Sequence, residues 1–161
     1  MSEAAFTIGA NPATTGAVSP RDFFTPEQVR ELEKAIRGAE SRTSGEIRIH
    51  LESACADPIV RATEVFEQLG MSKTRHNTGV LIYVAIVSQQ FTIIADSGIS
   101  RKVPGDFWDN IRDIMEAEFR QGRFLNGLRF GIEVAGIELA KFFPRPDDDT
   151  NELPDTLSYG N

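Results

Sequence analysis

Asp96 stands at the end of a short apolar run and is followed by Ser97 and Gly98. An acidic side chain at the end of a strand, next to a glycine that lets backbone approach closely, is typical of a polar site at the edge of a sheet. Its carboxylate could bind a cation, attack a substrate or cap a turn. The residues that could join it as oxygen ligands are Glu46, Asn77 and Asp109.

Two catalytic uses of Asp96 need a second carboxylate that the sequence does not supply. The string Ala-Asp-Ser-Gly is similar to the Asp-Ser/Thr-Gly turn of aspartic proteases, which use two such turns in an all-β fold. A phosphatase with an aspartate nucleophile would need an acid two positions on, where Gly98 stands. We therefore expect Asp96 to bind or to cap, because an Asp before Ser-Gly also suits a turn cap.

The segments that must position these residues include four helices. Apolar residues recur at helical spacing after good N-caps at Thr25 and Asp57, which predicts helices over residues 25–41 and 57–70. Two further helices are expected over residues 106–122 and 125–143. Three glycines within the last of them predict close packing against the sheet or the third helix.

Three strands complete the predicted fold. Residues 45–53 alternate between apolar and polar, which predicts a strand with one covered and one polar face. The apolar run 80–87 predicts a central strand, and residues 91–95 return beside it after a turn at 88–90. The fold class expected is α/β, an α/β/α sandwich with a mixed central sheet flanked by about four helices.

This topology predicts where the polar residues meet. If the first two strands are parallel, both begin at one edge of the sheet, and the third strand ends there. Glu46, Asn77 and Asp96 then gather at that edge, with Asp109 nearby at the start of a helix. Such oxygen clusters suit hard cations, Ca²⁺ first and Mg²⁺ second. The structural alternative stays open: Asp96 caps a turn, and Asp109 complements a helix dipole.

Composition limits the classes of partner. The net charge of −7 argues against a nucleic-acid surface, which needs clustered Lys and Arg. Cys55 is the only cysteine, so neither an intrachain disulfide nor a cysteine zinc site is expected. With no signal peptide or membrane span, a cytoplasmic location is expected. His50 and His76 are both expected at the surface.

The chain divides into three parts. Residues 1–20 lack periodicity and are expected to be a disordered arm. Residues 21–144 hold the predicted α/β domain. Residues 145–161 carry five acidic residues and one arginine, which predicts a solvated acidic tail.

An ordered set of segments resembles the soluble or membrane-tethered bacterial branch of the TPM domain family over about residues 22–155. The segments are TSGEIRIHLES, TRHNTGVLIYVAI, FTIIADSGI and FRQGRFLNGLRFGI, followed by FFP and NELPD. The resemblance implies a compact α/β/α sandwich. The family includes calcium-binding bacterial proteins, an auxiliary subunit of acetylcholine receptors and a thylakoid-lumen acid phosphatase.

The predicted oxygen cluster and the resemblance together lead to two functions of different classes, and a purely structural adaptor without a metal stays open as a third. The first is a calcium-binding regulatory or interaction domain whose protein partner can be membrane-associated. The second is a metal-assisted acid phosphatase acting on phosphomonoesters, in which Arg75 and Arg101 hold the phosphate. The first is favoured because the chain shows no nucleophile with a matched base.

Overall fold

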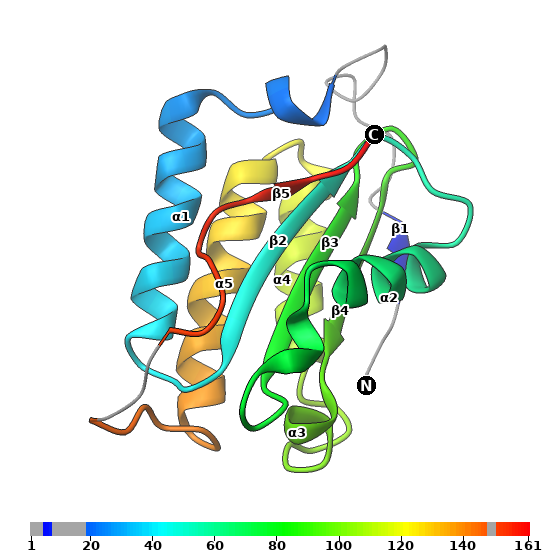
Figure 1. Ribbon diagram of the computed structural model, residues 1–161. Helices are drawn as coiled ribbons and strands as arrows, with labels where there is room; N and C mark the ends of the chain where they lie inside the picture. The colour runs from blue at the N-terminus through cyan, green and yellow to red at the C-terminus, as the bar shows by residue number, and fades with distance from the viewer. Residues whose placement is uncertain (1–4, 8–18, 148–150) are drawn as a thin grey trace.

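The computed structural model describes residues 5–7, 19–147 and 151–161, and these form a mixed sheet with helices on both faces (Figure 1). The predicted α/β/α sandwich is confirmed. The helices are α1 (Pro26–Glu40), α2 (Pro58–Gln68), the short α3 (Ser97–Ser100), α4 (Asp109–Arg120) and α5 (Phe124–Ala140), with 3-10 turns η2 (Pro20–Asp22) and η3 (Met71–Lys73).

The sheet has five strands in the order β1-β4-β3-β2-β5. The strands are β1 (Ala5–Thr7), β2 (Glu46–Glu52), β3 (Gly79–Ala85), β4 (Gln90–Ala95) and β5 (Ser158–Tyr159). β2 runs parallel to β3, and β3 is antiparallel to β4, as the sequence predicted. β1 and β5 are additional edge strands, antiparallel to β4 and parallel to β2.

Local sequence signals set the helix ends. Thr25 and Gln28 form a capping box at the start of α1, with hydrogen bonds in both directions. Asp57 caps α2 by accepting from two backbone amides.

Within α5, a Cβ at Gly127 or Gly131 would come within 2.6 Å of Phe119 or Met115 on α4, so the predicted close packing is confirmed for these two glycines. Gly136 packs instead against Ala39 of α1.

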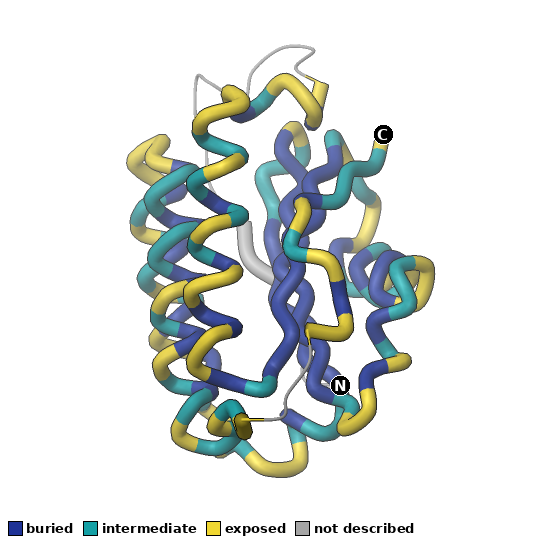
Figure 2. The backbone as a smooth tube through the Cα atoms, turned by 60° about the vertical axis from the view of Figure 1, so that its left-hand side comes forward, coloured by how far each residue is buried: buried dark blue, intermediate teal, exposed yellow. Residues whose placement is uncertain are grey.

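The sheet separates two apolar cores. The larger lies between the sheet and α1, α4 and α5, and the smaller lies under α2. All residues of β2 and β3 are buried, which Figure 2 shows as a dark centre between more exposed helices. None of the helices in the described part of the chain is long and apolar enough to cross a membrane.

The two predicted flanking segments are more ordered than expected where the structure describes them. In the predicted arm, Ala5–Thr7 pairs with β4 and Pro20 is buried in η2, while residues 1–4 and 8–18 lie outside the described residues. At the other end, residues 151–161, which we call the strap, lie along β2 instead of extending into solvent. Leu153 and Leu157 are buried there, which explains the difference.

Candidate functional site

Three of the predicted ligands lie at one end of the sheet. Glu46 is opposite Gly79 in the β2–β3 register, and the backbone amide of Asp96 donates to the Gly79 carbonyl at 2.9 Å. Asn77 lies just before β3. Adjacent strands therefore place Glu46, Gly79 and Asp96 side by side, as the topology predicted.

Asp96 is a buried carboxylate with one oxygen used and one unused. Its Oδ1 accepts a hydrogen bond from the Ser97 amide at 2.7 Å and caps α3, which confirms the capping role. Its Oδ2 is buried and has no hydrogen-bond partner among the described residues. The residue is 8% exposed, so solvent reaches this carboxylate poorly. The capping role thus accounts for one carboxylate oxygen of Asp96 and leaves the other unexplained.

The loop before β3 lies against the start of α3. Asn77 adopts a left-handed conformation with φ of 56°, and its carbonyl accepts from the Gly98 amide at 2.9 Å. A Cβ on Gly98 would collide with the carbonyl oxygens of His76 and Asn77, so this close approach requires glycine. We call Asp96, Gly98, His76 and Asn77 the Asp96 corner.

The Asp96 corner offers oxygen atoms of the kind that hard cations prefer. It combines a carboxylate oxygen without a partner with two successive backbone carbonyls beside the same turn. Across the described ranges, no group of three or more His, Cys, Asp or Glu side chains could hold a metal ion. A cation at this corner would therefore depend on few protein ligands and on water for the rest.

Glu46 is at the same edge, but its carboxylate holds the strap. Its Oε1 accepts from the Glu152 amide at 2.6 Å, and its Oε2 accepts from the Leu153 amide at 2.9 Å. Between it and Asp96 lies Gly79, where a Cβ would meet the Met71 carbonyl at 2.9 Å. The space between the two acids is therefore filled by η3, and a metal role for Glu46 stays a prediction.

The outer predicted residues are exposed. Asp109 is the first residue of α4 and forms an ion pair with Arg112 one turn on. Arg101 ends α3, and the Arg75 amide donates to Glu152 Oε2 at 3.0 Å. The structure therefore leaves the ligand role of Asp109 and the phosphate-binding roles of Arg75 and Arg101 as predictions.

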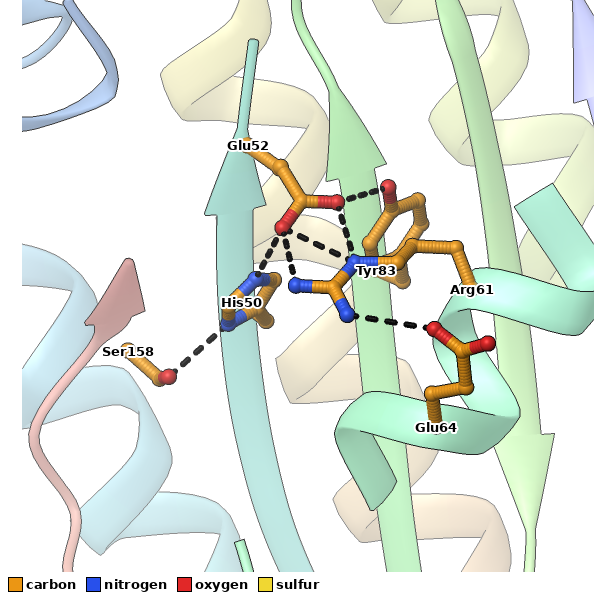
Figure 3. A network of polar contacts seen from close by, with 6 residues as sticks. All are labelled: His50, Glu52, Arg61, Glu64, Tyr83 and Ser158. Carbon is orange, nitrogen blue, oxygen red and sulfur yellow. Dashed lines mark hydrogen bonds and ion pairs between the residues drawn. The ribbon is translucent and has the colours of Figure 1, made fainter. Parts of the chain in front are cut away.

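A second polar group lies on the α2 face of the sheet, and sequence reasoning missed it (Figure 3). Glu52 is at its centre: Arg61 donates to it through Nε at 2.8 Å and Nη2 at 2.7 Å, and the Tyr83 hydroxyl donates at 2.5 Å. His50 Nε2 lies 3.3 Å from Glu52, and its Nδ1 lies 2.8 Å from the Ser158 hydroxyl.

The prediction that His50 is at the surface is wrong, because α2 and the strap cover the polar face of β2. His50 is 4% exposed and stacks on the Tyr83 ring at 5.7 Å. Glu46, Arg48 and Glu52 on the same face are equally buried. Alternation along β2 identified this face as polar, but alternation does not indicate that polar partners from other elements cover it. His76 is exposed, as predicted.

Burial and hydrogen bonds shift the pKa values in this group. Burial alone would raise the pKa of Glu52, but hydrogen bonds from Arg61, Tyr83 and His50 lower it to about 2. Burial lowers the pKa of His50 more than the nearby Glu52 raises it. Burial and the Glu52 carboxylate raise the pKa of Tyr83. At neutral pH the group therefore consists of a carboxylate, a guanidinium, a phenol and a neutral imidazole.

Glu40, at the end of α1, is a buried acid whose pKa is raised, whereas that of Glu52 is lowered. Its Oε2 accepts from the Ile47 amide at 2.9 Å. Burial, followed by the neighbouring Asp155 of the strap, raises the pKa of Glu40 to about 10. This side chain is therefore protonated at neutral pH, which makes it a poor cation ligand under those conditions.

Comparison with known proteins places this arrangement in a family. The TPM domain profile matches residues 18–136, and the chain belongs to the TPM domain family. No curated protein matches the chain.

Two solved structures are similar. The BA42 protein from the psychrophilic bacterium Bizionia argentinensis is 48% identical with a TM-score of 0.83, over 86% of this chain and 96% of that one. The N-terminal domain of a P. gingivalis protein is 19% identical with a TM-score of 0.59, over 76% of this chain and 82% of that one. The second likeness shows the fold alone.

Proposed function

We propose that this TPM domain is a divalent-cation-binding regulatory or interaction module that binds Ca²⁺, with Mg²⁺ as a competitor. The observation that carries the proposal is the Asp96 carboxylate, whose Oδ2 is buried without a hydrogen-bond partner among the described residues. Leaving a charged oxygen buried and unpaired is unfavourable. A cation bound to that oxygen would remove the cost.

The residues of the Asp96 corner fit this role. Asp96 would provide the charged ligand, and the carbonyls of His76 and Asn77 are uncharged oxygens in the adjacent loop before β3. A bound cation would supply positive charge between the loop before β3 and the start of α3. Because only the folded chain brings these segments together, binding would stabilise the fold by mass action.

The proposal is tested by replacing Asp96 with asparagine. Asp96→Asn keeps an oxygen to cap α3 and removes the charge. At a Ca²⁺ concentration about 100 times the dissociation constant, the unmodified chain should gain about 2.7 kcal/mol and melt at a higher temperature. The variant should lose most of this gain. Calorimetric titration and melting curves with Ca²⁺ and with Mg²⁺ measure both effects.

Asp113→Asn is the matched control, because it removes an exposed acid on α4 that is not one of the predicted ligands. It should bind the cation almost as well as the unmodified chain. An absence of heat and of any melting shift at millimolar cation would refute the proposal. Equal binding by the Asp96→Asn variant would show that the ion lies elsewhere.

A metal-assisted acid phosphatase is the second candidate. It is favoured by one observation: Asp96 and Arg101 flank the four-residue helix α3 as its N-cap and its C-cap. In this reading Arg101 and Arg75 would hold the phosphate, and the cation would polarise it. Hydrolysis of an aryl phosphate by the unmodified chain and its loss in Asp96→Ala and Arg101→Ala would support it. Equal rates in all three would point to a contaminant.

A further inference from the structure

The strap lies along the outer edge of β2, the edge that faces away from β3 (Figure 1). Ser158 and Tyr159 pair in parallel with His50 and Leu51. The Gly160 amide donates to the Leu51 carbonyl, and the Ser53 amide donates to the Asn161 carbonyl, both at 2.8 Å. The strap therefore satisfies backbone groups that β2 would otherwise present to solvent.

Side chains of the strap alternate between the two faces of the sheet. Leu157 is buried in the core under α1, and Tyr159 packs on the same side, with the Arg21 guanidinium 4.8 Å from its ring centroid. On the other side, Ser158 contacts His50, and Gly160 lies against Glu52. Leu153 is buried in the core under α2.

Gly160 is the strap position that most restricts which residue can pair with this edge. A Cβ at this position would collide with Glu52 Oε1. Glu52 cannot easily move away, because Arg61, Tyr83 and His50 all hold it. Any residue other than glycine is therefore excluded at the end of this edge, so the edge accepts only strands with a glycine at this position.

The strand pairing between the strap and β2 is short. β2 pairs with β3 over seven residues but with the strap over two. Leu153 and Leu157 are the strap's two buried residues. The TPM profile ends at residue 136, so the strap lies outside the matched domain. A strand edge that is covered by a short segment is able to exchange it for another strand.

We propose that the outer edge of β2 is a strand-binding surface, that the strap is its resident ligand, and that a partner provides an extended segment of the same chemistry. The segment would run parallel to β2. It would carry a leucine, three residues, a second leucine, a small polar residue, an aromatic residue and a glycine. This surface consists of the outer edge of β2 and the parts of both sheet faces beside it. It includes no residue of the Asp96 corner and does not depend on a cation there.

The test uses a fluorescent peptide with the sequence of residues 151–161 and the full chain carrying Gly160→Val. The substitution prevents the chain's own strap from seating beside Glu52 and leaves β2 unchanged. The peptide should bind this variant saturably. It should bind the unmodified chain more weakly by about tenfold or more, because the attached strap competes at a high effective concentration.

A peptide that itself carries Gly160→Val is the matched control and should bind neither chain. In NMR spectra, addition of the unmodified peptide should return the amide signals of Leu51 and Ser53 to their positions in the unmodified chain. Equal binding of both peptides, or no binding to a folded variant, would overturn the proposal.

A second variant covers the case in which Gly160→Val does not fold. Leu157→Asp removes a buried anchor of the strap and also leaves β2 unchanged. Circular dichroism establishes whether each variant is folded before titration. Unfolding of both variants would also overturn the proposal, because the strap would then be an integral part of the domain.

Discussion

At the scale of single residues, Glu52 carries the densest set of contacts in the polar group on β2. Its carboxylate accepts from Arg61 and Tyr83 and contacts His50, while its side chain is 4% exposed. Removing one partner of a buried ion pair leaves the other charge without compensation. The guanidinium of Arg61 would then retain only Glu64 as an acidic partner in the contacts described here.

We expect Glu52→Gln to destabilise the fold by about 3 kcal/mol, for this reason. Glu64→Gln is the control, because Glu64 pairs with the same arginine at 3.2 Å but is half-exposed. That change should cost less than about 1 kcal/mol. Urea unfolding of both variants gives the comparison. Losses of similar size would show that burial of the Glu52 pair does not contribute to stability.

The sequence predicted part of this chemistry. Asp96 was expected either to cap or to bind, and the cap at Ser97 is present. The group around Glu52 was missed because alternation along β2 indicates which side chains share a face, and not what covers that face. Arg61, which lies on α2, supplies the countercharge through a tertiary contact that no local pattern encodes.

At the scale of elements, the strands and helices followed from periodicity and caps. The capping box at Thr25 began α1, and the parallel β2–β3 pair followed from the order of elements. The strap was missed because its charge count suggested a solvated tail. Its two leucines and Gly160 were the overlooked signals, since they fit the edge of β2.

We expect Glu46→Gln to loosen the strap while the rest of the fold stays intact. The carboxylate of Glu46 accepts from two strap amides, and a charged hydrogen bond contributes about 1.5–3 kcal/mol. Hydrogen exchange at Leu153 should therefore become about tenfold faster or more. NMR exchange rates measure this.

Glu27→Gln, at an exposed acid in the first turn of α1, is the control for that measurement. It should leave the exchange rate at Leu153 unchanged. A Glu46→Gln variant with unchanged exchange would mean that β5 pairing and the two leucines hold the strap without help from Glu46.

At the scale of the whole molecule, two kinds of buried acid oppose each other as pH changes. The pKa values of Glu52 and His50 are lower in the folded chain, so the unfolded chain binds more protons in acid. Stability therefore falls as the pH drops below about 6.5, because of His50, and falls further between pH 4.5 and about 2, because of Glu52. The raised pKa of Glu40 has the opposite sign. The contribution of Glu40 to the stability of the fold is complete below pH 4.5 and is lost as the pH rises toward about 10.

We expect Glu40→Gln to stabilise the chain at neutral pH. Glutamine keeps an oxygen for the Ile47 amide and needs no proton. The gain should be small near pH 4.5 and reach about 3 kcal/mol at pH 7, since each pKa unit corresponds to about 1.4 kcal/mol. Urea unfolding between pH 4.5 and 9 measures it. A gain that did not change with pH would contradict protonation of Glu40 in the folded chain.

The two leucines of the strap have a mechanical consequence for the domain. The sheet keeps the core under α2 apart from the core under α1, α4 and α5, and the strap passes around the sheet edge with Leu153 in one and Leu157 in the other. The strap therefore joins the two layers at that edge. Tension on the strap would be transmitted to both layers together, so pulling on this segment would test how firmly the two halves of the molecule are joined.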